Sequence, residues 1–144
     1  MDARWDAVVF DLDGTLVDTA PDLHAHLIEM LAEVGRPGLP LEEVRPMIGD
    51  GARVLLQRGL DASGGMPPGV DLESLFREFL RRYTARPQRF GAVFAGVEAA
   101  LEALARGGVK LGICTNKPQA PTDRLLAELG LSRHFAAVVG GDSL

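Results

Sequence analysis

Residues 7–18 read AVVFDLDGTLVD. The first four form a short, continuous apolar run rich in β-branched side chains, and an Asp-Gly turn signal follows at positions 13 and 14. A run this short is typical of a strand, and unbroken apolar character indicates burial on both faces, as in a parallel sheet. We therefore expect residues 7–10 to be a strand of an α/β core whose carboxyl end opens onto a ligand site.

Two carboxylates follow this strand directly. Asp11 and Asp13 are separated by a single residue, so in extended chain their side chains point the same way. Both stay ionised only beside a cation or hydrogen-bond donors, and Mg²⁺, which prefers oxygen ligands, is the natural partner. Gly14 allows the backbone to turn sharply beside a substrate. The alternative is purely structural, with an ordinary Asp-Gly turn and Asp11 capping the strand end.

A second polar loop follows the next core strand. Thr115, Asn116 and Lys117 stand between a short apolar run and a helical pattern, where a hydroxyl, an amide and free N–H groups can bind an anion. Read alone, the segment is more typical of a helix cap than of a ligand site. The surrounding pattern predicts a helix at 96–106, a strand at 109–114, a helix at 118–129 and a strand at 135–139. Right-handed strand–helix–strand units would bring this loop and the acid pair to the same sheet edge.

The residues between the two loops have helical periodicity only. Apolar residues at helical spacing predict a helix from about 19 to 35, a short helix near 41–48, and a third helix that carries Val54, Leu55 and Leu60. Asp71 caps a further helix. The expected fold is α/β, with a doubly wound parallel sheet (an incomplete Rossmann-like core) and a small helical cap domain inserted after the first strand. The predicted domains are the first core segment and nucleophile loop at 1–18, the cap at 19–90 and the resumed core at 91–144.

The amino-acid composition argues against two classes of partner, nucleic acids and membranes. The 144 residues carry a formal net charge of −5, which argues against nucleic acid as a partner because no basic surface is available for phosphates. No apolar run approaches the roughly 18 residues of a membrane span, so no membrane partner is expected. The single cysteine, Cys114, and an acidic amino-terminus unlike a signal peptide favour the cytoplasm.

Taken together, these motifs resemble the haloacid dehalogenase superfamily of phosphotransferases. The apolar strand plus DLDGTLVDT is similar to the superfamily's first motif, the strand plus TNKP to its second, and the helical insertion to its small cap domain. Within the superfamily, TAPDL, the GDGA turn, TNKP and VVGGDS are most similar to the phosphoglycolate phosphatases. The resemblance extends over essentially the whole chain.

The resemblance implies roles for the matching residues. Asp11 would attack phosphorus and form an aspartyl-phosphate, and Asp13 would protonate the leaving alkoxide and then activate water. Asp11 and the backbone carbonyl of Asp13 would hold the Mg²⁺ cofactor. Thr115 and the backbone N–H of Asn116 would bind the transferring phosphoryl oxygens. The second acid argues against dehalogenation, which has no alkoxide to protonate, so the substrate implied is a small phosphorylated metabolite, with 2-phosphoglycolate favoured.

The family pattern continues beyond position 144 with a lysine segment and an acidic motif. We therefore expect this chain to be a truncated version of a longer enzyme, weakly active or inactive alone, with an open sheet edge along 7–10 that permits self-association. Lys117 could replace the missing lysine at the phosphate, although a solvated lysine is the favoured interpretation. Asp142 is interpreted as a turn residue rather than a replacement acid. The alternative functions are a sugar phosphomutase and a non-catalytic fragment that binds phosphate or a partner chain.

Other polar and aromatic residues of the cap are interpreted structurally. His24 and His26 are expected to face solvent. Arg45 and Arg53 flank the Gly49–Gly51 turn and are expected on the surface, with pairing to a substrate carboxylate as the alternative. The aromatic residues at helical spacing are expected to be core packing, namely Phe76, Phe79 and Tyr83.

Overall fold

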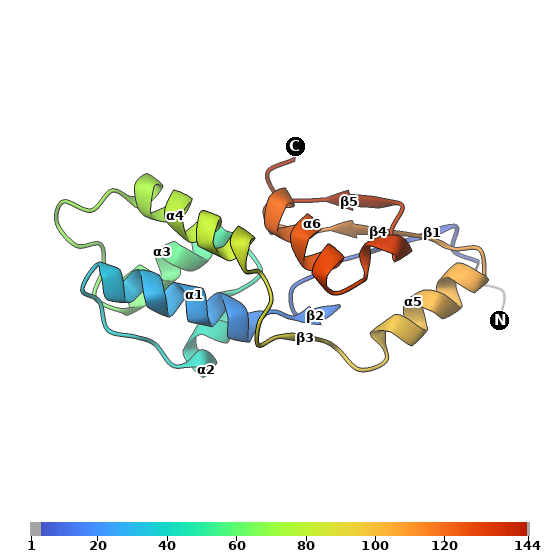
Figure 1. The fold of residues 1–144 in the computed structure, drawn as a ribbon, viewed down its shortest axis with the longest axis horizontal. Helices are drawn as coiled ribbons and strands as arrows, with labels where there is room; N and C mark the ends of the chain where they lie inside the picture. Colours follow the sequence, from blue (N-terminus) through green and yellow to red (C-terminus); the bar gives the residue numbers. More distant parts are fainter. Residues whose placement is uncertain (1–3, 144) are drawn as a thin grey trace.

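The computed structural model describes residues 4–143, which form a small sheet flanked by two helices and a separate group of helices beside it (Figure 1). The strands are β1 (Ala7–Phe10), β2 (Val17–Asp18), β3 (Ala92–Val93), β4 (Lys110–Cys114) and β5 (Ala137–Val139). The helices are α1 (Ala20–Glu33), α2 (Leu41–Val44), α3 (Ala52–Ala62), α4 (Leu72–Ala85), α5 (Val97–Arg106) and α6 (Gln119–Glu128), with 3₁₀ turns at Arg45–Met47 and Ser132–His134. None of the described helices combines the length and the apolar character needed to cross a membrane.

The main sheet has the order β1–β4–β5, and both neighbouring pairs are parallel. Phe10 lies beside Ile113, and Cys114 lies beside Val139, so the three strands end at nearly the same level. The loops after β1, β4 and β5 therefore emerge at one edge of the sheet. This arrangement confirms the predicted α/β class with a parallel sheet, and it places both polar loops on the side where α/β folds bind ligands.

The apolar core of the sheet region comes from the loop after β1, from α5, from β4 and from α6. Its buried members are Leu12, Leu16, Val17, Leu101, Leu111, Ile113, Leu125, Leu126 and Leu131. The expectation that β1 is buried on both faces is wrong for the described chain, because Val9 is 65 % exposed. Within residues 4–143, β1 has a strand on one side only, so its outer edge is open, as the sequence analysis expected, and one of its faces is also uncovered, which was not expected.

The helical group has a core of its own, built mainly by α1, α3 and α4. Leucines at helical spacing on α1 and α3 meet Phe79 and Tyr83 of α4, and both aromatic rings are fully buried. Asp71 caps α4 as predicted, with its carboxylate accepting from the backbone N–H groups of Glu73 and Ser74. The helices predicted from periodicity are therefore present.

Two connections join the helical group to the sheet region, and they pair with each other. Val17 and Asp18 of β2 lie antiparallel to Val93 and Ala92 of β3, a two-stranded ribbon that the sequence analysis did not predict. The ribbon lies beside the predicted domain boundaries at 18/19 and 90/91, which themselves stay predictions.

The expectation that the two histidines of α1 face solvent is wrong for His26. Its side chain is buried, and Nε2 lies 2.9 Å from the carbonyl oxygen of Arg86, at the end of α4. His24 is half-buried, with Nε2 2.6 Å from the carbonyl oxygen of Leu39. Both rings thus contact backbone within the helical region, so neither is presented as a free surface ligand.

Candidate active site

The acid pair lies where the sequence predicts it, in the loop that follows β1. Asp11 is exposed, and its Oδ1 accepts the N–H of Leu12 at 2.8 Å. The carbonyl oxygen of Leu12 accepts three successive N–H groups, which folds the next turn tightly. Gly14 has a positive φ of 76°, a conformation that glycine adopts without strain. This compact turn sets Asp11 at the sheet edge and directs Asp13 toward the second loop.

Asp13 joins the two polar loops. Its Oδ1 accepts the hydroxyl of Thr19 at 2.6 Å and the ammonium of Lys117 at 2.9 Å. The interpretation of Lys117 as a solvated lysine is wrong, because its side chain is only 2 % exposed and that of Asp13 only 10 %. Thr19 precedes α1 but makes no side-chain capping bond, and its hydroxyl donates to Asp13 instead. Residues 13 and 117, far apart in sequence, thus form a buried ion pair between the motifs.

The surroundings of Lys117 have opposing effects on the charge of its ammonium. Burial lowers the pKa of its ammonium below the usual value, while the nearby carboxylate of Asp13 acts in the opposite direction. The Nζ atom also lies 4.2 Å from the centre of the Tyr83 ring, a distance at which the ring face attracts a cation. Removing a charge from water is costly, so a buried lysine needs such partners to remain charged.

Thr115 and Asn116 hold the second loop in place. Thr115 is buried, its hydroxyl oxygen accepts the N–H of Lys117 at 3.1 Å, and its own N–H donates to Val139 at the end of β5. The side-chain amide of Asn116 donates to the carbonyl oxygen of Gly49 in the helical region at 2.9 Å. The loop therefore contacts the neighbouring strand and the helical group together, and its role at a phosphoryl group stays a prediction.

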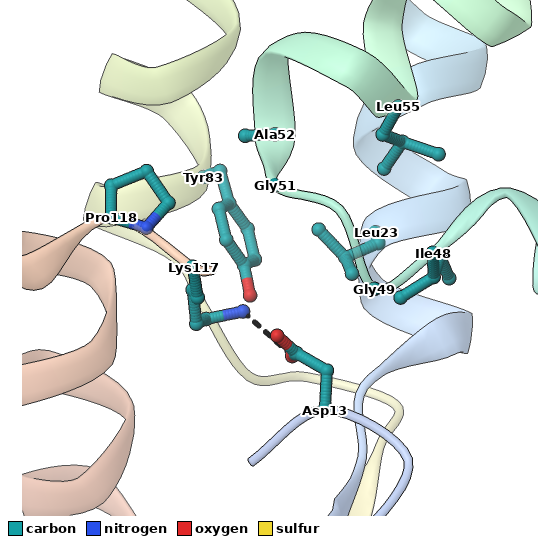
Figure 2. A pocket seen from close by; sticks show the side chains of 10 residues that line it. All are labelled: Asp13, Leu23, Ile48, Gly49, Gly51, Ala52, Leu55, Tyr83, Lys117 and Pro118. Atoms are coloured by element: carbon teal, nitrogen blue, oxygen red, sulfur yellow. Dashed lines mark hydrogen bonds and ion pairs between the residues drawn. The ribbon is translucent and has the colours of Figure 1, made fainter. Parts of the chain in front are cut away.

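A small cleft lies beside the ion pair (Figure 2). Asp13, Lys117 and Pro118 line it from the sheet region, and the rest of its wall comes from the helical region: Leu23, Ile48, Gly49, Gly51, Ala52, Leu55 and Tyr83. Asp11 and Thr115 do not line it. The cleft therefore lies on the side of the acid pair that faces the helices.

Tyr83 is the lining residue that the sequence analysis missed. Its ring belongs to the aromatic series of α4 and packs in the helical core, as expected, yet its hydroxyl has no hydrogen-bond partner among the described residues. Figure 2 shows the hydroxyl directed toward Lys117 and Asp13. Helical spacing could not distinguish this residue from Phe79, which packs beside it. The only signal in the sequence is the hydroxyl itself.

The two arginines considered for a substrate carboxylate are engaged elsewhere. Arg53 pairs with Glu73, which raises the pKa of the guanidinium, and it lies over the ring of Phe76 at 4.5 Å. Arg45 pairs with Asp18 at 2.9 Å. Both are exposed, as the favoured interpretation predicted.

Asp142 lies in the loop after β5. Its Oδ1 accepts the N–H of Gln119, the first residue of α6, at 2.7 Å. The carboxylate thus satisfies an N–H group at the start of a helix, which agrees with the structural interpretation.

The donor set at the sheet edge fits a hard cation. Among residues 4–143 no cluster of three or more His, Cys, Asp and Glu side chains surrounds a common point. Asp11 nevertheless keeps one carboxylate oxygen, and Asp13 keeps its backbone carbonyl oxygen, for which the described residues supply no partner. Mg²⁺ is commonly held by one or two carboxylates together with water, so these two residues suit it.

Comparison with known proteins agrees with this geometry. The family profile of haloacid dehalogenase-like hydrolases matches residues 5–144. A phosphoglycolate phosphatase of Cereibacter sphaeroides (strain ATCC 17029) is 44 % identical over 137 residues, covering 95 % of this chain and 63 % of the relative. One from Caulobacter vibrioides is 43 % identical over 141 residues, covering 98 % of this chain and 60 % of the relative.

A solved structure shows the same likeness. The crystal structure of a predicted phosphoglycolate phosphatase from Haemophilus somnus 129pt superposes with a TM-score of 0.92 at 30 % identity, covering 100 % of this chain and 66 % of that one. The chain thus spans about 60 % of the length of the curated relatives that it matches. On its motifs, its fold and these matches, the chain belongs to the haloacid dehalogenase-like hydrolase family.

Proposed function

We propose that this chain carries the phosphoryl-transfer centre of a Mg²⁺-dependent phosphatase that hydrolyses 2-phosphoglycolate through an aspartyl-phosphate. The ion pair between Asp13 and Lys117 is the observation that carries the proposal, because it joins the acid loop to the second loop within 2.9 Å. The substrate is inferred from relatives that are named phosphoglycolate phosphatases. Phosphoryl transfer depends on alignment and charge neutralisation, and this sheet edge can supply both.

The first step uses the exposed carboxylate of Asp11. Its oxygen attacks phosphorus, an Asp11–phosphorus bond forms, and the bond from phosphorus to the ester oxygen breaks. Asp13 gives its proton to the departing alkoxide. Lys117 and Thr19 both donate to Oδ1 of Asp13, which leaves Oδ2 as the atom that carries the proton. The hydroxyl of Thr115 lies in the second loop, where it would bind a phosphoryl oxygen.

The second step regenerates the free carboxylate. Asp13 takes a proton from water at Oδ2, water attacks phosphorus, and the bond to Asp11 breaks with release of phosphate. When Mg²⁺ is bound, the carboxylate of Asp11 and the backbone carbonyl of Asp13 would hold it, which leaves Oδ2 of Asp13 for proton transfer, and the ion would neutralise negative charge on the phosphoryl oxygens. The helical group beside the cleft would limit access of bulk water and of large substrates.

Asp11→Asn and Asp13→Asn separate the two roles. With 2-phosphoglycolate and Mg²⁺, we expect the wild-type chain to acquire one phosphoryl group after acid quench, detected by intact mass and mapped to Asp11. Asp11→Asn should acquire none, whereas any phosphoenzyme formed by Asp13→Asn should persist longer because water is not activated. Asp61→Asn, on an exposed position of α3, is the matched control and should behave as wild type.

Two results would contradict this proposal. A phosphoryl group on a residue other than Asp11, or an equal amount of phosphoenzyme in Asp11→Asn, would show that Asp11 is not the nucleophile. Return of the phosphoryl group to another hydroxyl of glucose 1-phosphate, rather than to water, would favour a phosphomutase on the same scaffold.

The proposed setting is the cytoplasm. Cys114 is a free, exposed thiol at the end of β4, beside the second loop, and a reducing compartment would keep it reduced. The proposed partner is a small phosphorylated metabolite, and we also propose self-association through the open edge of β1.

A further inference from the structure

We propose that Lys117 and Tyr83 form the subsite for the carboxylate of the substrate, and so set the preference of the site for phosphate esters of short hydroxy acids. This inference rests on the proposed function, because it concerns the part of the ester that leaves with the alkoxide. It assigns specificity to a buried lysine and a buried tyrosine rather than to the exposed arginines.

The position of the cleft indicates which part of a substrate enters it. Asp13, the proposed proton donor to the leaving oxygen, lines the cleft, whereas Asp11 and Thr115, the proposed contacts of the phosphoryl group, do not. A phosphoryl group on Asp11 therefore has its leaving oxygen beside Asp13, and the remainder of the alcohol extends toward the helices. The cleft is the space that receives this remainder.

The chemistry of the cleft selects an anion for that end. Most of its wall is apolar, with Leu23, Leu55 and Pro118 among its lining residues, and an apolar wall alone would favour an uncharged alcohol. Two donors interrupt it, namely the ammonium of Lys117 and the hydroxyl of Tyr83. An ammonium has three donor hydrogens, and Asp13 is the one carboxylate that accepts from it among the described residues.

The hydroxyl of Tyr83 supports the same assignment independently of Lys117. Its side chain is fully buried, and its hydroxyl has no partner within residues 4–143 although it is directed into the cleft (Figure 2). A buried hydroxyl without an acceptor is unfavourable, and such groups are commonly found where a ligand completes them. A carboxylate has two acceptor oxygens, so one group can satisfy both Tyr83 and Lys117, and bonds to a charged acceptor are the stronger kind.

The structure also explains why the arginines do not take this role. Arg53 is held by Glu73 and lies over Phe76, and Arg45 is held by Asp18, and neither lines the cleft. A substrate carboxylate would have to compete with an existing carboxylate for either guanidinium. Lys117 is also paired with a carboxylate, that of Asp13, but it lines the cleft and its ammonium has further donor hydrogens, so a substrate carboxylate would share it with Asp13 rather than displace it.

A matched pair of non-hydrolysable ligands tests the assignment without turnover. 3-Phosphonopropionate has the length and carboxylate of 2-phosphoglycolate, and propylphosphonate has a methyl group in place of the carboxylate. Binding of each to the full chain with Mg²⁺ would be measured by titration calorimetry. We expect the wild type to bind the carboxylated ligand at least roughly 10-fold more tightly, since hydrogen bonds to charged groups contribute that much or more.

Two variants and one control decide the outcome. Tyr83→Phe removes only the unpartnered hydroxyl, so it should fold normally and reduce the preference several-fold, and Lys117→Met should bring the ratio of the two affinities to about one. Arg53→Ala should keep the wild-type ratio. Equal affinity of the wild type for both ligands would overturn the proposal, as would a full preference retained by Tyr83→Phe.

The result is separable from the proposed hydrolysis. A chain that shows the preference and loses it in Tyr83→Phe, yet forms no phosphoenzyme, has the carboxylate subsite and lacks the proposed reaction. A chain that is labelled at Asp11 but binds the two phosphonates equally has the reaction and lacks the subsite.

Discussion

Replacement of Asp22 by asparagine should detach the connection that leads from α4 back to the sheet. Asp22 lies on α1 and is buried, and its carboxylate accepts three successive backbone N–H groups of that connection. Oδ1 accepts from Arg89 at 2.8 Å and from Phe90 at 2.9 Å, and Oδ2 accepts from Gly91 at 2.7 Å. One side chain thus holds three consecutive residues immediately before β3.

The magnitude follows from these contacts. Asparagine can keep the two bonds to its oxygen, but its amide group would face the N–H of Gly91, so two donors would meet in a buried site. Loss of that charge-assisted bond costs about 1.5–3 kcal/mol. The two remaining bonds become neutral and weaken, so we expect the free energy of unfolding to fall by about 3 kcal/mol in total.

Urea denaturation followed by circular dichroism measures this change. Glu29→Gln is the control on the same helix, because Glu29 is half-exposed and its nearest cationic nitrogen, on Arg82, is 4.0 Å away. A surface change of this kind should stay within about 0.5 kcal/mol of the wild type. If Asp22→Asn also stays within that range, the carboxylate does not hold the connection and the reasoning is refuted.

Three further predictions concern other parts of the chain. Two neighbouring arginines lower the pKa of Glu78 from 4.5 to about 2, so this carboxylate stabilises the fold above pH 4.5 and its contribution is lost as the pH falls toward 2. In acid titrations, Glu78→Gln should therefore lose less stability than the wild type over that pH range. Gly91→Ala should lower the free energy of unfolding by more than about 2 kcal/mol, because its Cβ would clash with the carbonyl oxygen of Asp18. Gly107→Ala, whose Cβ would have its nearest contact at 3.4 Å, should be nearly neutral in the same urea denaturation. Analytical sedimentation at rising protein concentration should show that the wild type self-associates and that Val9→Lys does not, because a charge on the exposed strand β1 opposes strand pairing. Association unchanged in Val9→Lys would show that the contact lies elsewhere.

The parts of the fold that follow from local patterns could be predicted. A four-residue apolar run marked β1, a largely apolar stretch at 109–114 marked β4, and helical spacing marked α1, α3 and α4. Asp71 was identifiable as a cap because its side chain satisfies N–H groups two and three residues ahead, a purely local contact. The placement of both polar loops at one sheet edge followed from the rule for parallel strands.

The features that depend on distant partners could not be predicted in the same way. The ribbon of β2 and β3 joins residues 17–18 to residues 92–93, and a two-residue strand leaves no periodic pattern to detect. His26 looked exposed because its partner is a backbone oxygen at residue 86, which no spacing rule reveals. The open face of β1 gave the same difficulty, since an apolar run indicates a capacity for burial and not the presence of a neighbour.

Lys117 shows most clearly how a local interpretation fails at a site. A lysine at a helix start is ordinarily solvated, because burying an ammonium without partners is costly. Here the cost is offset by Asp13, which is 104 residues away, and by the ring of Tyr83. Neither partner is close to Lys117 in the sequence. The burial of Lys117 is therefore explained only when Asp13 and Tyr83 are considered with it. All three residues line an otherwise apolar cleft, and for that reason we assign them to ligand binding rather than to the stability of the fold.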